Sequence, residues 1–193
     1  MKIVCVVGIR GSGKTTTITN LIEEFSRRGL RCGTVKTIFC PSFSMDDPKS
    51  NTARHRRSGA EIICAKAKRE TTFVLPRPLT NREILSFYDE MDYVILEGDY
   101  LAPVPRLVAA HGEEDAQPRI NELTLAVVGR AATGEKTLLG LPALDGVSNV
   151  SALADFLVKN LPDTPLEALD HPLPESELSG DGYCRNHCEH HHS

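Results

Sequence analysis

The stretch Gly8-Ile9-Arg10-Gly11-Ser12-Gly13-Lys14-Thr15 fits the pattern G-x-x-x-x-G-K-[ST] at every fixed position. An apolar run, Ile3–Val7, precedes it and is typical of a buried strand. After it, apolar residues recur at helical spacing, at Ile18, Leu21, Ile22 and Phe25. A strand, a glycine-rich loop and a helix in this order are the context that a phosphate-binding loop requires. The sequence therefore predicts a nucleotide-binding α/β protein.

Each part of this loop suits a phosphate group. Glycines allow sharp backbone turns and bring N–H groups close to phosphate oxygens, and the following helix adds the positive end of its dipole. Lys14 can reach the β- and γ-phosphates, and the Thr15 hydroxyl can hold Mg²⁺. A glycine-rich turn without a ligand is the alternative, but it does not account for the agreement of both flanks. The predicted nucleotide contacts are Gly8, Arg10, Gly11, Ser12, Gly13, Lys14, Thr15 and Thr16.

Length and composition narrow the possible classes of protein. With 193 residues, 40% of them hydrophobic, the chain is long enough for one α/β domain with a buried core and a tail. Its formal net charge of -4 argues against nucleic acid as a partner, and it has no apolar run of about 18 residues that would span a membrane. The first strand begins too early for a signal peptide. We expect a cytoplasmic protein whose six cysteines are reduced.

The remaining pattern predicts alternating strands and helices. A helix over 14–28 ends at Gly29, a typical C-cap glycine, and the next strand should run parallel to the first through a right-handed crossover. A long loop covers 39–52, and an exposed loop covers 111–122. The predicted strands are 2–8, 31–38, 61–65, 71–75, 93–97, 106–110, 123–128 and 141–144, and the further helices are 54–57, 81–91 and 150–161.

A second motif ends the apolar run Tyr93–Glu97. Such a run is typical of a central parallel strand, and its terminal carboxylate emerges at the sheet edge where the phosphates lie. This is the position of a Walker B acid, which holds Mg²⁺ directly or through water. Lys14 and Glu97 are therefore the predicted catalytic residues. Asp92, at the other end of the strand, is a poorer candidate, and a simple surface acid is the alternative for Glu97.

Four basic residues in a row, Arg54-His55-Arg56-Arg57, follow the long loop. They can contact an anion, either a nucleotide phosphate or a phosphorylated partner. They can equally form the solvated face of a short helix, and the sequence leaves both possibilities open.

The end of the chain concentrates side chains that bind soft metals. Cys184, His187 and Cys188, followed by three more histidines, suit Zn²⁺, Ni²⁺ or an iron–sulfur cluster. A terminal histidine run can also be the remnant of a purification tag. Several prolines and acids precede this cluster, which predicts an extended tail over 162–193 after a nucleotide-binding domain over 1–161.

The order of these motifs resembles the MobB family, the molybdopterin-guanine dinucleotide biosynthesis adaptor proteins. Beside the phosphate loop, the resemblance rests on Val35-Lys36, Asp46-x-Pro48, Thr52-x-Arg54, Gly59-Ala60 and Leu96-Glu97-Gly98. It implies a P-loop NTPase fold, a three-layer α/β/α arrangement with a mainly parallel sheet, and a homodimer. It also implies GTP binding with weak hydrolysis, in support of the enzyme that attaches GMP to molybdopterin. By position, Asp46 joins Thr15 and Glu97 as a Mg²⁺ residue, and Arg54 becomes a nucleotide contact.

The sequence also departs from the family pattern. Lys36-Thr37 stands where the family usually has Lys-His, and Asp99-Tyr100 stands where it usually has Phe-Lys. No Asn-Lys-x-Asp stretch is present to read guanine, so GTP as the nucleotide rests on the resemblance. Two alternatives stay open. One is a metallochaperone GTPase that delivers a metal such as nickel to an apo-metalloenzyme, and the other is a small-molecule kinase.

Overall fold

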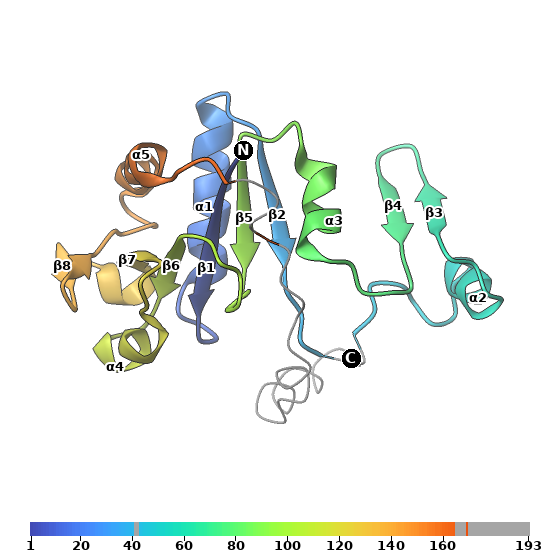
Figure 1. Ribbon diagram of the computed structural model, residues 1–193, viewed down its shortest axis with the longest axis horizontal. Coiled ribbons are helices and arrows are strands. Elements are labelled where there is room, and N and C mark those ends of the chain that lie inside the picture. The colour runs from blue at the N-terminus through green and yellow to red at the C-terminus, as the bar shows by residue number, and fades with distance from the viewer. Residues whose placement is uncertain (41–42, 165–168, 170–193) are drawn as a thin grey trace. The chain divides into compact units, whose positions relative to one another are not determined.

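Five parallel strands form the centre of the first of two units into which the chain folds in a computed structural model (Figure 1). The structure describes residues 1–40, 43–164 and 169. Of these residues, 1–37, 81–164 and 169 belong to the first unit, and 38–40 and 43–80 belong to the second. The predicted domain boundary at residue 161 stays a prediction, because most of the residues beyond it lie outside the described part of the chain.

The sheet of the first unit has the order β2-β5-β1-β6-β7, and every neighbouring pair is parallel. The predicted parallel sheet is thereby confirmed. The three pairings among β5, β1, β6 and β7 join strands whose interior residues are almost wholly buried, as expected for a sheet that is covered on both faces, whereas the edge strand β2 has only half-buried and exposed residues. The strands are β1 (Lys2–Gly8), β2 (Cys32–Lys36), β5 (Tyr93–Glu97), β6 (Arg106–Ala109) and β7 (Thr124–Val128).

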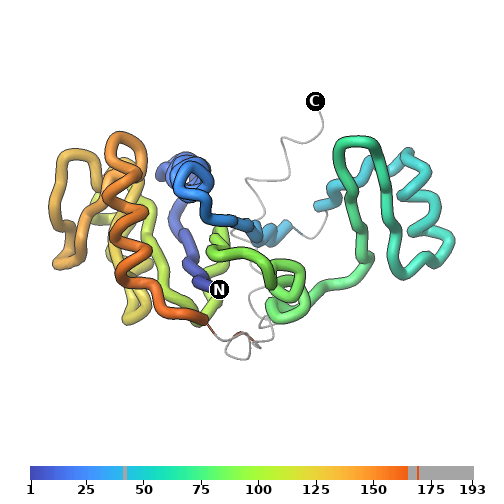
Figure 2. Tube along the Cα trace, turned by 90° about the horizontal axis from the view of Figure 1, so that it is seen from above, coloured from blue at the N-terminus to red at the C-terminus, as the bar shows by residue number. Residues whose placement is uncertain are grey.

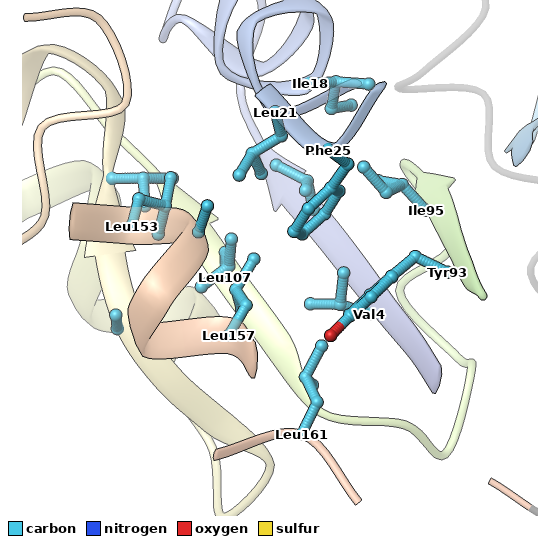
Figure 3. Close-up of a cluster of buried hydrophobic side chains, with 14 of the residues drawn as sticks. Val4, Ile18, Leu21, Phe25, Tyr93, Ile95, Leu107, Leu153, Leu157 and Leu161 are labelled. Atoms are coloured by element: carbon cyan, nitrogen blue, oxygen red, sulfur yellow. The ribbon is translucent and has the colours of Figure 1, made fainter. Parts of the chain in front are cut away.

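Helices α1 (Lys14–Arg27) and α5 (Val150–Asn160) lie side by side on one face of this sheet (Figures 1 and 2). The apolar stripe of α1 that the sequence predicts is buried against the strands, and Phe25 stacks on Tyr93 with ring centroids 4.3 Å apart. Figure 3 shows this core, in which α5 contributes leucines at helical spacing. The labelled members are Val4, Ile18, Leu21, Phe25, Tyr93, Ile95, Leu107, Leu153, Leu157 and Leu161.

The end of α1 follows the predicted glycine stop. Gly29 has φ of +76°, its N–H donates to Ser26 O at 2.9 Å, and the N–H of Leu30 donates to Phe25 O at 2.9 Å. These two bonds form a Schellman motif, in which a glycine takes the left-handed conformation just beyond the helix. The chain is thereby turned back toward β2.

On the other face of the sheet, α3 (Asn81–Leu85) and the 3-10 turn η1 (Ser86–Tyr88) contribute Leu85 and Tyr88 to a second apolar cluster. The Tyr88 ring lies against Gly33 of the edge strand β2, where any side chain would collide with it, and the Tyr88 hydroxyl donates to Thr34 O at 2.7 Å. The helix predicted to reach residue 91 is shorter than expected. The Ser86 hydroxyl donates to Glu83 O at 2.7 Å, a local bond of the kind that competes with helix continuation.

Two further expectations about the first unit are wrong. The exposed loop predicted over 111–122 contains α4 (Glu113–Ala116) and the 3-10 turn η2 (Gln117–Arg119), and Ala116 is fully buried. Its acids suit the first turn of a helix, where the dipole is positive. The strand predicted over 141–144 is only β9 (Leu141–Pro142), which pairs with β8 (Thr137–Leu138) in a separate antiparallel hairpin. A 3-10 turn η3 (Gly129–Ala132) follows β7.

The second unit contains α2 (Asn51–Arg57) and an antiparallel hairpin of β3 (Ile63–Lys66) and β4 (Thr71–Val74), which Figure 2 shows in cyan and green. The short helix predicted over 54–57 and the two strands predicted over 61–65 and 71–75 are confirmed, and the two strands pair with each other. Ser50 caps α2, because its hydroxyl accepts from the N–H of Ala53 at 2.9 Å. Across both units, no helix in the described part of the chain is long and apolar enough to cross a membrane.

Candidate phosphate-binding site

The loop between β1 and α1 has the backbone that a phosphate cradle requires. Gly13, the residue before α1, has φ of +100°, a left-handed conformation that favours glycine, and no side chain of the described residues caps the helix there. The first amide N–H groups of α1 therefore stay available to an anion at the positive end of the dipole. Gly8, at the start of the loop, passes so close to Ala109 O that a Cβ would collide with this carbonyl oxygen.

Lys14 folds back over its own loop. Its ammonium donates to Gly8 O at 2.8 Å and to Ile9 O at 2.6 Å. Burial lowers the pKa of Lys14 below the ordinary value of 10.5, and Lys36 and Arg119 lower it further, whereas Glu97 opposes them. The side chain that the motif assigns to the β- and γ-phosphates is thus a partly desolvated cation at the mouth of the loop.

Glu97 lies beside this loop, as the sequence predicts. The Thr15 hydroxyl donates to the Glu97 carboxylate at 3.2 Å, and the Lys36 ammonium lies 3.6 Å from the same oxygen. The register of the sheet brings Glu97 to these two residues, because Glu97 pairs with Val6 of β1 on one side and with Lys36 of β2 on the other. The Glu97 side chain is only 15% exposed, so its charge is not well screened by water.

Asp92 has a different role at the opposite end of β5. Its carboxylate accepts from the N–H of Arg31 at 2.7 Å, which secures the entry into β2. The choice of Glu97 over Asp92 as the acid next to the loop agrees with the structure.

The Thr15 hydroxyl and the Glu97 carboxylate are a suitable donor set for Mg²⁺. Both are hard oxygen ligands, and Mg²⁺ is usually held by one or two carboxylates together with substrate phosphates and water. Within residues 1–40, 43–164 and 169, no group of three or more His, Cys, Asp or Glu side chains is placed to hold a metal ion by itself. One hydroxyl and one carboxylate fit a Mg²⁺ ion whose other ligands are nucleotide phosphates and water.

Three contacts to the loop come from residues that sequence reasoning missed. The Tyr100 hydroxyl accepts from the Gly8 N–H at 3.1 Å and donates to Gly8 O at 2.8 Å. His111 Nε2 lies 3.4 Å from Arg10 O. The position of Tyr100, three residues after Glu97, was the one local signal that could have indicated such a contact.

The end of β7 supports the loop from another side. The N–H of Arg130 donates to Ser12 O at 3.3 Å, and Gly129, with φ of +78°, leaves no room for a Cβ against this same carbonyl. Ser12 is fully buried, and its hydroxyl donates to Ile9 O at 2.8 Å. No local pattern in the sequence marks these residues, because the contact joins segments more than a hundred positions apart.

The other predicted nucleotide contacts lie in different places. Arg10, Gly11 and Thr16 are exposed at the loop and the start of α1. Arg54 is exposed on α2, which belongs to the second unit, so its role as a phosphate contact stays a prediction. The Cys184, His187 and Cys188 cluster lies outside the described residues.

Asp46, the third predicted Mg²⁺ residue, also belongs to the second unit. Its carboxylate accepts from the Ser50 hydroxyl at 2.6 Å and from the Thr52 hydroxyl at 2.8 Å. The hydrogen bond from Ser50, followed by that from Thr52, lowers the pKa of Asp46 below its ordinary value. In the structure Asp46 organises the start of α2, and its predicted role at Mg²⁺ stays a prediction.

A parallel sheet of this order, covered by helices on both faces, with a glycine-rich loop from β1 to α1 and an acid at the end of β5, defines a protein of the P-loop NTPase fold class. The model of one family, Molybdopterin guanine dinucleotide synthesis protein B (MobB), matches residues 3–133. The chain belongs to this family.

Individual relatives agree with this assignment. A probable molybdopterin-guanine dinucleotide biosynthesis adapter protein of Bacillus subtilis is 25% identical over 166 residues, which cover 82% of this chain and 92% of that protein. The corresponding adapter protein of Haemophilus influenzae is 27% identical over 158 residues, covering 79% and 85%. The fold is similar to the crystal structure of Bacillus subtilis MobB, with a TM-score of 0.65, 24% identity and coverage of 85% and 100%.

Proposed function

We propose that this protein is a GTP-binding P-loop adaptor in molybdenum cofactor biosynthesis, at the step that makes molybdopterin guanine dinucleotide, and that it hydrolyses GTP weakly. The observation that carries the proposal is the meeting of Thr15 with Glu97 at 3.2 Å beside the Lys14 ammonium. The relatives that are named as adapters in this synthesis support it. Residues 1–161 are the proposed nucleotide-binding domain.

Each residue of the site has a defined task in this proposal. The amides at the start of α1 and the Lys14 ammonium bind the phosphates, and Thr15 and Glu97 hold Mg²⁺. The bound ion neutralises charge on the β- and γ-phosphates. Lys14 and Glu97 thus bind phosphate and metal and do not activate water, which is why we expect slow hydrolysis.

The partners follow from the same role. We expect a homodimer that contacts the enzyme attaching GMP to molybdopterin, in the cytoplasm, where free cysteines such as Cys5 and Cys32 stay reduced. Light scattering coupled to size exclusion measures the oligomeric state. A pull-down with that enzyme, in the presence and absence of GTP, tests the partner.

The decisive experiment is calorimetric titration of the purified protein with GTP and with ATP, each with Mg²⁺. We expect GTP to bind more tightly. Lys14→Ala should abolish binding, whereas Lys159→Ala, which removes an exposed lysine from the last turn of α5, should leave it unchanged. Unchanged affinity in Lys14→Ala would refute the assignment of the site.

Other outcomes would favour the two alternatives. A preference for ATP, with transfer of phosphate to an added metabolite, would favour a small-molecule kinase. Stoichiometric binding of Zn²⁺ or Ni²⁺ that is lost on truncation at Pro174 would favour a metallochaperone that serves an apo-metalloenzyme, with Cys184, His187 and Cys188 as ligands.

A further inference from the structure

We propose that Tyr100 is a positioning residue of the phosphate loop. Its hydroxyl holds the backbone of Gly8 in place while the Lys14 ammonium moves from the loop to a phosphate. This inference deepens the proposed function and rests on it, since it concerns the same loop.

The Tyr100 hydroxyl bonds to both backbone groups of Gly8. The hydroxyl accepts from the Gly8 N–H at 3.1 Å and donates to Gly8 O at 2.8 Å. Gly8 is buried at the end of β1, where the strand becomes the loop. A buried amide that loses its partner is costly, so this hydroxyl fixes the direction in which the loop leaves the sheet.

Lys14 uses the same acceptor. Its ammonium donates to Gly8 O at 2.8 Å and to Ile9 O at 2.6 Å. These bonds use two of the three donors of the ammonium, and the bond to Gly8 O breaks when the side chain swings away from the start of the loop toward a phosphate. Tyr100 still donates to Gly8 O at that moment, so the carbonyl keeps a partner and the loop keeps its shape.

Tyr100 is itself held rigidly. Gly98, with φ of +80°, donates its N–H to Val6 O at 3.0 Å. Asp99 is only 4% exposed, and its carboxylate accepts from the N–H groups of Leu101 at 3.1 Å and Ala102 at 3.0 Å. The turn from Glu97 to Tyr100 is therefore fixed at both ends, and it joins the acid beside Thr15 to the first glycine of the loop.

The test compares two variants that each remove one hydroxyl bonded to a backbone carbonyl. Tyr100→Phe removes the contact with Gly8, and Tyr88→Phe removes the contact with Thr34 O, which belongs to β2 and not to the loop. Pyrophosphate with Mg²⁺ is the probe, titrated by calorimetry. We expect affinity about three- to tenfold weaker in Tyr100→Phe, the range for one hydrogen bond, because of its two bonds only the one to Gly8 O replaces a bond that Lys14 gives up. We expect affinity within about twofold of wild type in Tyr88→Phe.

Amide hydrogen exchange on the nucleotide-free protein provides a second readout. Exchange over residues 8–13 should be faster in Tyr100→Phe and unchanged in Tyr88→Phe, although both variants lose a tyrosine hydroxyl that bonds to the backbone. Unchanged exchange over 8–13, or pyrophosphate affinity equal to wild type, would overturn the inference. Failure of wild type to bind either pyrophosphate or GTP would overturn the proposed function, and the exchange result would still decide whether Tyr100 holds the loop.

A measurement on the unmutated protein covers the case in which Tyr100→Phe does not fold. The chain has four tyrosines and no tryptophan, so labelling with 3-fluorotyrosine gives a simple fluorine NMR spectrum. Because Lys14 shares the acceptor Gly8 O with the Tyr100 hydroxyl and leaves it for the phosphate, the Tyr100 resonance should shift on addition of pyrophosphate, and the Tyr88 resonance should not. A Tyr100 resonance that does not respond to bound pyrophosphate would overturn the inference.

Discussion

Thr15 and Glu97 are 82 positions apart in the chain, and the Thr15 hydroxyl donates a hydrogen bond to the Glu97 carboxylate at 3.2 Å. Parallel pairing of β1 with β5 brings them together. Glu97 is the last residue of β5, and Thr15 follows the loop that leaves the carboxyl end of β1, so both lie at the same edge of the sheet. The contact links the two halves of the predicted site, the phosphate loop and the acid.

Glu97→Gln should weaken Mg²⁺-dependent nucleotide binding. The amide keeps the shape of the side chain and an oxygen that can accept from Thr15, but it loses the charge that attracts the metal. We expect the affinity for GTP to fall about tenfold or more in Mg²⁺, about 1.4 kcal/mol for each factor of ten, and to change little in EDTA. Asp92→Asn, at the other end of the same strand, is the control. Equal losses with and without Mg²⁺ would show that Glu97 does not act through the metal.

Nucleotide binding should weaken at alkaline pH because Lys14 must be charged to hold a phosphate. Its pKa lies below the ordinary 10.5, chiefly through burial, so the ammonium is lost at lower pH than in an exposed lysine. We expect the affinity for pyrophosphate to fall as the pH rises toward 10.5. In Lys14→Arg the guanidinium stays charged, so any remaining affinity should not show this fall. A wild-type affinity that is constant over this range would contradict the prediction.

Gly129→Ala should destabilise the protein far more than Gly134→Ala. The two glycines have almost the same conformation, with φ of +78° and +79°. A Cβ on Gly129 collides with Ser12 O, whereas a Cβ on Gly134 meets nothing within 4 Å. Placing alanine in this left-handed backbone conformation costs about 1–2 kcal/mol of stability at both positions. The collision of its Cβ with Ser12 O adds about 1–3 kcal/mol at Gly129. Urea unfolding of both variants measures the difference, and equal losses would show that the contact with the loop adds nothing.

The loss of folding stability at acid pH should depend on Glu24. This side chain is 6% exposed and binds the guanidinium groups of Arg27 and Arg28, and Arg28 also binds Asp155 of α5 at 2.6 Å. The hydrogen bond from Arg27, followed by that from Arg28, lowers the pKa of Glu24 from 4.5 to about 2. A lowered pKa in the folded state stabilises the protein above the unfolded pKa, and this contribution is lost as the pH falls from 4.5 to about 2.

Glu24→Gln should therefore be less stable than wild type at neutral pH, and the difference should disappear as the pH falls through this range. Thermal unfolding followed by circular dichroism at several pH values measures it. Glu23→Gln is the matched control, because Glu23 is the exposed neighbouring acid on the same helix. A difference between Glu24→Gln and wild type that stays constant with pH would rule out this linkage.

The sequence predicted those parts of the fold that short-range patterns determine. Three neighbouring elements were identified in this way: β1 from the run Ile3–Val7, the loop from its glycines, and α1 from the stripe between Ile18 and Phe25. An unbroken apolar run indicates a buried strand, and apolar residues three or four positions apart indicate a helix. Glu97 was placed correctly because parallel strands bring their carboxyl ends to one edge. Gly29 was identified as a stop because only a glycine easily takes the left-handed conformation there.

The contacts that shape the loop could not be predicted in the same way. Tyr100, His111 and Gly129 reach the loop from three different strand ends, and no local motif indicates which side chain will touch which carbonyl. The helix α4 was missed because its residues, Glu113–Ala116, contain one apolar position, which gives no periodicity to detect. Long-range packing decides these details, and a single sequence contains little information about it.

The packing of Tyr88 on β2 has a consequence for behaviour at high concentration. β2 is the last strand on its side of the sheet, and a strand in this position presents backbone groups that can pair with another molecule and start aggregation. The Tyr88 hydroxyl donates a hydrogen bond to Thr34 O, and the Tyr88 ring lies against Gly33, where the strand has no side chain. One aromatic residue thereby blocks the centre of the strand against unwanted self-association.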